Sequence, residues 1–332
     1  MEGPVSITRS MTMSIVFALA CAPPASLAPD VRPLEAGSFA DSVLSANVTL
    51  HGTLLVPAAS RPPVVLIIAG SGPTDRDGNS PILPGKNNSL RYTVEALAER
   101  GIASLRYDKR GIGQSSTPLG NESDLRFDHF IDDAVAWGQK LRSDRRFSSV
   151  TVIGHSEGSL IAMLAAPRIP AAGVVSIAGT GFPASEVILR QIRAQFTPDQ
   201  AAQVEAALQS VARGEAPGEV PPPLGAMLFR PSILPYLASW FRYDPRVVAG
   251  AVGAPLLVVQ GTHDVQTLEE DARAIVAGNP GATLKLIPGM NHVLKQSPAG
   301  RLEQTAVYSD STIAIDPTLV EAISSFVSKN RP

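Results

Sequence analysis

The sequence predicts an α/β fold, in which helices cover both faces of a mostly parallel sheet. Short apolar runs that are typical of buried strands alternate with helical patterns through most of the chain. The chain has 332 residues, of which 44% are hydrophobic, and this is enough for one large domain with an insertion. The net charge of −2, without any basic patch or charge run in the sequence, argues against a nucleic-acid partner.

The first residues differ in composition from the rest. An apolar run of about ten residues follows Arg9, whereas a span across a bilayer needs roughly twenty. The run ends in Ala18-Leu19-Ala20, so we interpret residues 1–20 as a secretory signal peptide. Residues 21–37 then form a Pro/Ala-rich linker.

This interpretation predicts that the protein is exported. Two outcomes stay open: Cys21 is lipidated and holds the protein on a membrane, or cleavage after Ala20 yields a free periplasmic or secreted protein. If residues 1–36 are not a signal, the protein is cytoplasmic. Cys21 is also the only cysteine, which excludes an intramolecular disulfide and a cysteine nucleophile in the body of the chain.

Seven predicted strands follow the linker. The first, residues 47–57, alternates polar and apolar residues like an exposed hairpin strand. Six short apolar strands come next: 63–69, 102–108, 149–154, 173–179, 255–261 and 283–289. Helical patterns lie between most of them, for example Leu90–Arg100 and Phe127–Leu141. We therefore assign residues 38–182 and 252–332 to the α/β core.

The interval 183–251 is far longer than an ordinary connection between neighbouring elements. It contains helical patterns at 185–196 and 199–212, a Pro/Gly-rich break at 216–223, and then the stretch 232–245. We interpret it as a helical cap, inserted after the strand 173–179 and lying over the edge of the sheet.

Aromatic residues gather in the last part of this cap. Tyr236 and Trp240 are four positions apart and share one helix face. With Phe229 and Tyr243 they could wall an apolar binding pocket. The alternative, that they only hold the cap onto the core, is left open.

A serine stands between two glycines at a predicted strand-to-helix turn. The strand 149–154 runs into GHSEG at positions 154–158, and an Ala/Leu/Met-rich stretch typical of a helix follows. A G-x-S-x-G elbow holds its serine in a strained backbone conformation with the hydroxyl exposed at the sheet edge, and the glycines permit close packing. The pattern therefore predicts that Ser156 is a nucleophile.

A serine hydroxyl needs a base, and the base needs an orienting carboxylate. Of the five histidines, only His263 and His292 follow the elbow. His292 and Asp264 each follow a predicted strand, so the carboxyl edge of a parallel sheet would bring both toward Ser156. His263 is the rival base, although a residue beside Asp264 would point its side chain elsewhere. Asp264 could instead cap the next helix, for which Thr267 is better placed.

Five motifs together resemble the α/β-hydrolase superfamily over roughly residues 48–329. They are the elbow, GTHD at 261–264, GMNH at 289–292, RYDKRGIGQS at 106–115 and IIAGSGPTDRDGN at 67–79. The last loop is most similar to bacterial serine-aminopeptidase-like hydrolases and small carboxylesterases. The resemblance implies an α/β-hydrolase fold, and it implies that the N–H groups of Glu157 and Ser71 form an oxyanion hole. The usual His-Gly start of that second loop is replaced here by Ala69-Gly70.

The resemblance also implies a reaction, the hydrolysis of a small-molecule carboxylic ester with a short or medium acyl group through an acyl-enzyme, without a cofactor. A peptidase or amidase of the serine-aminopeptidase type is the alternative, in which Glu157 or the Asp75–Asp77 cluster would hold the N-terminus of the substrate. A non-catalytic binding protein is the third alternative. For Asp75, Arg76 and Asp77 the sequence favours a solvated surface turn over a clamp on the cap or on polar groups of the substrate. The sequence DRDGNS at 75–80 is similar to an EF-hand calcium loop, but Gly78 does not stand where the EF-hand spacing requires a glycine. No metal is therefore expected. The sequence does not indicate the oligomeric state.

Overall fold

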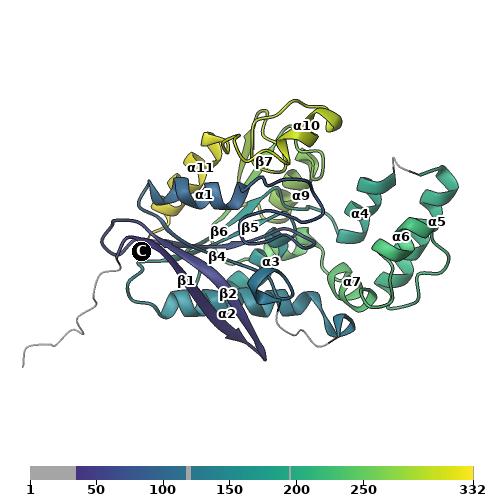
Figure 1. Ribbon diagram of the computed structural model, residues 1–332, viewed down its shortest axis with the longest axis horizontal. Coiled ribbons are helices and arrows are strands. Elements are labelled where there is room, and N and C mark those ends of the chain that lie inside the picture. Colours follow the sequence, from purple (N-terminus) through teal and green to yellow (C-terminus); the bar gives the residue numbers. More distant parts are fainter. Residues whose placement is uncertain (1–34, 117–120, 194–195, 332) are drawn as a thin grey trace, which may run out of the picture. The chain divides into compact units, whose positions relative to one another are not determined.

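A computed structural model describes residues 35–116, 121–193 and 196–331 of the protein (Figure 1). The predicted signal peptide, Cys21 and all but the last residues of the predicted linker lie outside these ranges, so the predictions about export stay predictions. Within the described ranges, no helix combines the length and the apolar character needed to cross a membrane.

The core is an eight-stranded sheet in the order β1-β2-β4-β3-β5-β6-β7-β8. The strands are β1 (Gly37–Ser45), β2 (Val48–Val56), β3 (Val64–Ile68), β4 (Ala103–Tyr107), β5 (Val150–His155), β6 (Gly173–Ile177), β7 (Leu256–Gly261) and β8 (Thr283–Ile287). β1 and β2 pair antiparallel with each other, β2 pairs antiparallel with β4, and all the other pairs are parallel. The predicted fold class, a mostly parallel sheet with helices, is confirmed.

Helices cover both faces because neighbouring residues of the central strands point to opposite sides. In β3, Val64 and Leu66 belong to one hydrophobic cluster and Val65 and Ile67 to the other. The first cluster includes α2 (Phe127–Ser143) and α3 (Glu157–Ala165), and the second includes α1 (Ser89–Ala98) and α11 (Pro317–Lys329). Figure 1 shows α1 and α11 together on one side of the sheet and α2 on the other. Helices α9 (Glu269–Gly278) and α10 (Arg301–Val307) and three short 3₁₀ turns at Gly113–Ser115, Glu122–Asp124 and Ala166–Arg168 complete the body.

Between β6 and β7, the described residues form a series of helices rather than strands. They are α4 (Ala184–Arg193), α5 (Pro198–Ala212), α6 (Pro222–Met227), α7 (Leu234–Phe241) and α8 (Pro245–Gly250). We call the segment 183–251 the cap segment. Helix α6 overlaps the end of the predicted Pro/Gly-rich break. It starts with prolines, which a first helical turn accepts because its N–H groups have no partner within the helix.

Two strands differ from expectation. β1 was not predicted, and it starts at Gly37, the last residue of the predicted linker. Its alternating exposure and its antiparallel partner β2 make the two strands a hairpin. β8 was expected to be buried, but Thr283 and Lys285 are exposed and Leu284 and Leu286 only half-buried, because β8 is the edge strand and pairs only with β7.

Candidate active site

Ser156 stands at a strained corner between β5 and α3. Its backbone has φ 55° and ψ −122°, a region that a residue with a Cβ rarely occupies; such strain costs on the order of 1–3 kcal/mol. The flanking glycines are needed because the strand and helix nearly touch. A Cβ on Gly154 would lie 1.9 Å from the carbonyl oxygen of Gly158, and one on Gly158 would lie 2.3 Å from that of Ile68. The turn therefore has the geometry of the elbow that its sequence predicts.

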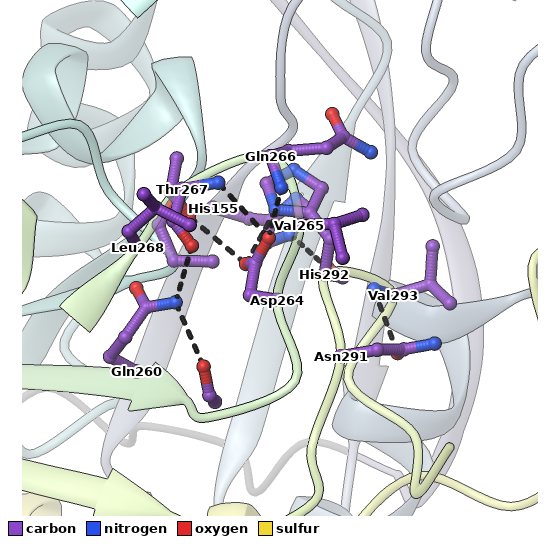
Figure 2. A network of polar contacts seen from close by, with 12 residues as sticks. His155, Gln260, Asp264, Val265, Gln266, Thr267, Leu268, Asn291, His292 and Val293 are labelled. Carbon is purple, nitrogen blue, oxygen red and sulfur yellow. Dashed lines mark hydrogen bonds and ion pairs between the residues drawn. The ribbon is translucent and has the colours of Figure 1, made fainter. Parts of the chain in front are cut away.

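Asp264 and His292 form a buried hydrogen-bonded pair (Figure 2). Nδ1 of His292 lies 2.7 Å from Oδ2 of Asp264, and the two residues are each 5% exposed. Oδ1 of Asp264 accepts hydrogen bonds from the backbone N–H groups of Gln266 and Thr267, at 2.8 and 3.0 Å. The hydroxyl of Thr267 donates to Oδ2 at 3.0 Å. Both oxygens of the carboxylate are thus held, and the carboxylate in turn orients the imidazole.

The surroundings of Asp264 keep it ionised. Burial alone would raise the pKa of Asp264, but the facing His292 and the two backbone donors outweigh burial, so the pKa lies below its ordinary value. An ionised Asp264 accepts the Nδ1 proton of His292 and leaves Nε2 of that ring as the basic nitrogen.

His155 links the elbow to the loop that carries His292. Its Nε2 lies 2.8 Å from the backbone carbonyl oxygen of His292, to which it must donate, and the two rings are 4.8 Å apart between centroids. Burial and the neighbouring His292 lower the pKa of His155 to about 3, so its ring is neutral at neutral pH. Sequence reasoning assigned no role to His155, because the contact joins residues far apart in the chain.

Ser156 and His292 are brought to the same edge of the sheet without being hydrogen-bonded. Ser156 follows β5 and His292 follows β8, both at carboxyl ends of parallel strands. Between these two described residues no hydrogen bond is formed. In proteins without substrate such catalytic contacts are often long and tighten only in the complex.

The side chain of His263 and the start of α9 have other partners than the rival assignments require. Nδ1 of His263 lies 2.6 Å from the carbonyl oxygen of Ser297, so this ring is engaged away from Asp264. The N-cap of α9 is Leu268, not Thr267. The N–H of Leu268 donates a hydrogen bond to the carboxylate of Asp271. Asp264 binds N–H groups of the loop before that helix and orients His292 as well.

A cavity of about 960 Å³ opens beside Ser156. It is lined on one side by residues of the core, including Ser71, Ser156 and Glu157, and on the other by the cap segment. Much of the wall is apolar, from residues such as Ile112, Leu125, Phe130, Val187, Ile188 and Leu237. The size lies at the upper end of the range for small-molecule sites, about 300–1,000 Å³.

Two of the four predicted cap residues line this cavity. Tyr236 and Trp240 do, and Trp240 also stacks on Phe127 of α2, with centroids 5.6 Å apart and planes 7° apart. The pair therefore borders the cavity and also packs the cap segment onto the core, while a role in substrate binding stays a prediction. Phe229 and Tyr243 are not among the lining residues. They lie before and after α7, and the hydroxyl of Tyr243 donates to Asp128 instead.

The carboxylate of Glu157 is buried in a cluster with Lys109 and Tyr236. Oε1 lies 3.3 Å from Nζ of Lys109, and Oε2 accepts a hydrogen bond of 2.9 Å from the hydroxyl of Tyr236. Burial and the adjacent carboxylate hold the pKa of Tyr236 well above its ordinary value, so the phenol keeps its proton. Both carboxylate oxygens of Glu157 therefore have partners. The three residues are far apart in the sequence, and no sequence pattern predicted that they would meet.

The Asp75–Asp77 turn is neither freely solvated nor directed at the cap segment. Arg76 forms an ion pair of 2.6 Å with Asp108, and Asp77 one of 2.7 Å with Arg106. Oδ1 of Asp75 accepts hydrogen bonds from backbone N–H groups within the turn. The turn therefore braces the end of β4. Among the described residues, no group of three or more His, Cys, Asp or Glu side chains is arranged to hold a metal ion.

Comparisons with known proteins show what the chain is similar to. Residues 86–213 match the family described as serine aminopeptidase, S33. Esterase EstD of Thermotoga maritima is 29% identical over 266 residues, which cover 77% of this chain and 60% of EstD. The chain thus spans less than two thirds of the length of this curated relative.

Solved structures of similar fold include enzymes with esterase and peptidase names. Est1E from Butyrivibrio proteoclasticus with bound ferulic acid has a TM-score of 0.59 at 18% identity, covering 87% of this chain and 98% of Est1E. An esterase of Pyrococcus furiosus has a TM-score of 0.58 at 15% identity, covering 88% and 91% of the two chains. Proline iminopeptidase of Mycobacterium smegmatis has a TM-score of 0.56 at 16% identity, covering 88% and 98%. The chain therefore has the α/β-hydrolase fold, and its sequence resembles bacterial carboxylesterases and serine-aminopeptidase-like hydrolases.

Proposed function

We propose that the protein is a serine hydrolase that cleaves carboxylic esters. The observation that carries the proposal is the strained Ser156, open to the apolar cavity, at the same sheet edge as the 2.7 Å contact between His292 and Asp264. The similarity to EstD supports the same activity.

In the proposed reaction, Oγ of Ser156 attacks the ester carbonyl carbon while Nε2 of His292 takes the hydroxyl proton. Asp264 holds the Nδ1 proton and stabilises the imidazolium. The tetrahedral oxyanion accepts hydrogen bonds from the N–H groups of Glu157 and Ser71, both of which border the cavity. His292 then returns the proton to the leaving alkoxide, and water hydrolyses the acyl-enzyme by the same steps in reverse order.

The cavity supports an acyl group of medium size rather than a very short one. An acetyl group would leave most of the 960 Å³ unfilled, whereas a longer or aromatic acyl group would contact the apolar wall formed by core and cap segment. Each methylene group buried there contributes about 0.8 kcal/mol to binding. Affinity should therefore rise with acyl length until the cavity is filled.

A peptidase or amidase is the second candidate, because the matched family is described as serine aminopeptidase. An aminopeptidase needs a carboxylate that can receive the free ammonium group of its substrate. The carboxylates suggested for this purpose are engaged: Glu157 with Lys109 and Tyr236, Asp75 within its own turn and Asp77 with Arg106. This observation favours the ester over the aminoacyl substrate.

Parallel assays test the proposal. Purified protein is given p-nitrophenyl esters of increasing acyl length and aminoacyl-p-nitroanilides under the same conditions. We expect turnover of the esters, with kcat/KM highest at medium length, and much slower turnover of the anilides. Faster cleavage of the anilides would favour the peptidase, and an inert protein would favour the binding protein.

A further inference from the structure

Lys109 is a buried cation that touches both sides of the predicted oxyanion site. Its Nζ donates to the carbonyl oxygen of Gly70 and lies 3.3 Å from Oε1 of Glu157. The side chain is 3% exposed, and Nζ also lies 5.3 Å from the centroid of the Phe130 ring. Lys109 borders the cavity beside Ser156. It is therefore not an ordinary surface lysine.

The charged neighbours of Lys109 in the chain point to other partners. Asp108 pairs with Arg76, and Arg110 pairs with Asp133 of α2. Asp108 thereby also reaches the loop after β3, at Arg76, but of these three consecutive charged residues it is Lys109 that contacts both Gly70 and the start of α3.

The contact with Gly70 acts on the second predicted donor. The carbonyl of Gly70 and the N–H of Ser71 belong to one planar trans peptide group, in which they point in opposite directions. An ammonium group that holds the carbonyl therefore also sets the direction of the Ser71 N–H. It polarises the peptide group as well, which strengthens the N–H as a donor.

The contact with Glu157 acts on the first predicted donor. Glu157 is the first residue of α3, and its carboxylate is held by Lys109 from the core and by Tyr236 from the cap segment. With its side chain fixed from two sides, the backbone of Glu157 and its N–H have little freedom to turn. Preorganised donors of this kind stabilise the transition state without reorganisation during the reaction.

We propose that Lys109 is a positioning residue of the oxyanion site, which orients the N–H of Ser71 through the Gly70 carbonyl and the N–H of Glu157 through its carboxylate. The proposal rests on the proposed ester hydrolysis, because an oxyanion forms only when Ser156 adds to a carbonyl group.

The test compares Lys109→Met with the double variant Lys109→Met/Glu157→Gln. The double variant leaves no unpaired buried carboxylate, so it should fold where the single variant is destabilised. We would measure kcat and KM on the preferred p-nitrophenyl ester, the melting temperature, and Ki for an alkyl trifluoromethyl ketone. Addition of Ser156 to this ketone, with the proton passing to His292, yields a hemiketal oxyanion that probes the donors directly.

We expect kcat of the folded double variant to fall about 10²-fold, as for the loss of one oxyanion donor. KM should stay within about threefold, and Ki for the ketone should rise in parallel with the fall in kcat/KM. Arg190→Met is the matched control, because it removes a partly buried ion pair between α4 and Asp271 that does not touch the elbow. It should lower the melting temperature while kcat and Ki stay as in the unmodified protein.

If the double variant folds and keeps kcat and Ki, Lys109 has only a structural role and the inference is wrong, while ester hydrolysis by the unmodified protein still stands. If the unmodified protein cleaves no ester and does not react with the ketone, the proposed function fails and the inference fails with it.

If neither variant folds, the inference is tested by adding methylammonium to Lys109→Ala, in place of the missing ammonium group. The cavity gives access to the site, so kcat should rise with methylammonium but not with tetramethylammonium, and equal responses to both would contradict the inference.

Discussion

Nε2 of His155 donates a hydrogen bond of 2.8 Å to the backbone carbonyl of His292, which joins the nucleophile elbow to the loop of the proposed base. His155 is buried against the ring of His292, near the carboxylate of Asp264. The residue immediately before Ser156 thus holds the residue that would activate Ser156. Because His155 is titratable, we expect the stability of the protein to depend on pH.

The stability of the protein should fall on mild acidification because of His155. Burial and His292 lower the pKa of His155 to about 3 in the folded protein, against 6.5 ordinarily. Between these values the unfolded chain binds a proton that the folded chain does not, so the free energy of unfolding decreases as the pH falls through this window. The decrease from pH 7 to pH 5 is about 2 kcal/mol from this residue alone, at 1.36 kcal/mol per pKa unit.

Urea unfolding at pH 7 and pH 5 measures this decrease, with His155→Gln as the comparison. Glutamine keeps an amide donor for the carbonyl of His292 but does not titrate. The variant should lose about 2 kcal/mol less than the unmodified protein between the two pH values. Equal losses in both proteins would show that His155 is not the source.

If Ser156, His292 and Asp264 form the proposed triad, substitution of each of them should lower kcat steeply. Ser156→Ala and His292→Ala should each lower kcat on the order of 10⁴-fold or more, and combining them should add little, because the residues act as a unit. Asp264→Asn should also lower it steeply, because an amide cannot stabilise the imidazolium.

His263→Ala is the control for these variants, since His263 bonds to Ser297 and not to Asp264. It should retain most of the turnover. If His263→Ala lowered kcat steeply and His292→Ala lowered it only slightly, the base would have been assigned to the wrong histidine.

Acyl-length preference should respond to bulk added inside the cavity. Ile188 of α4 borders the cavity, so Ile188→Trp should lower kcat/KM for long acyl esters about tenfold or more relative to short ones, as expected for one or two excluded methylene groups. Val247→Trp is the matched control, because Val247 lies on α8 of the same cap segment and is 72% exposed. An unchanged preference in Ile188→Trp would mean that acyl groups bind elsewhere.

The prediction about export concerns residues outside the described structure. A lipidated Cys21 should carry label from palmitate and hold the protein in the membrane fraction, since acyl chains contribute about 0.8 kcal/mol per buried CH₂. Expression of the full chain beside Cys21→Ser checks this. Label that disappears with Cys21→Ser supports the anchor, an unlabelled protein that begins at Cys21 indicates simple cleavage, and an intact N-terminus in the cytoplasm would refute export.

Strand-end placement explains why so much of the site was predictable from sequence. Parallel strands share a carboxyl edge, so a motif after each strand, such as Ser156 after β5 and Asp264 after β7, can be placed without knowing any side-chain contact. The fold class followed from the same alternation of strands and helices. The exposure of β8 was missed: Thr283 and Lys285 alternate with Leu284 and Leu286, a pattern typical of a half-exposed strand, and β8 lies at the edge of the sheet.

The contacts that sequence reasoning missed join distant parts of the chain. Lys109 meets Gly70 and Glu157, and Tyr236 meets Glu157, across long sequence separations that no local pattern encodes. Phe229 was wrongly expected at the cavity for a related reason. Helical spacing relates residues within α7, such as Tyr236 and Trp240, but not a residue that precedes that helix.

The central claim is that Ser156 is the nucleophile of an ester hydrolase, and covalent labelling tests it most directly. A fluorophosphonate reacts with an activated serine hydroxyl, which displaces fluoride and forms a stable phosphonyl ester. Peptide mapping should find one adduct, on Ser156, and the adduct and the esterase activity should both be absent from Ser156→Ala. An adduct on another residue, or ester turnover that survives in Ser156→Ala, would contradict the account.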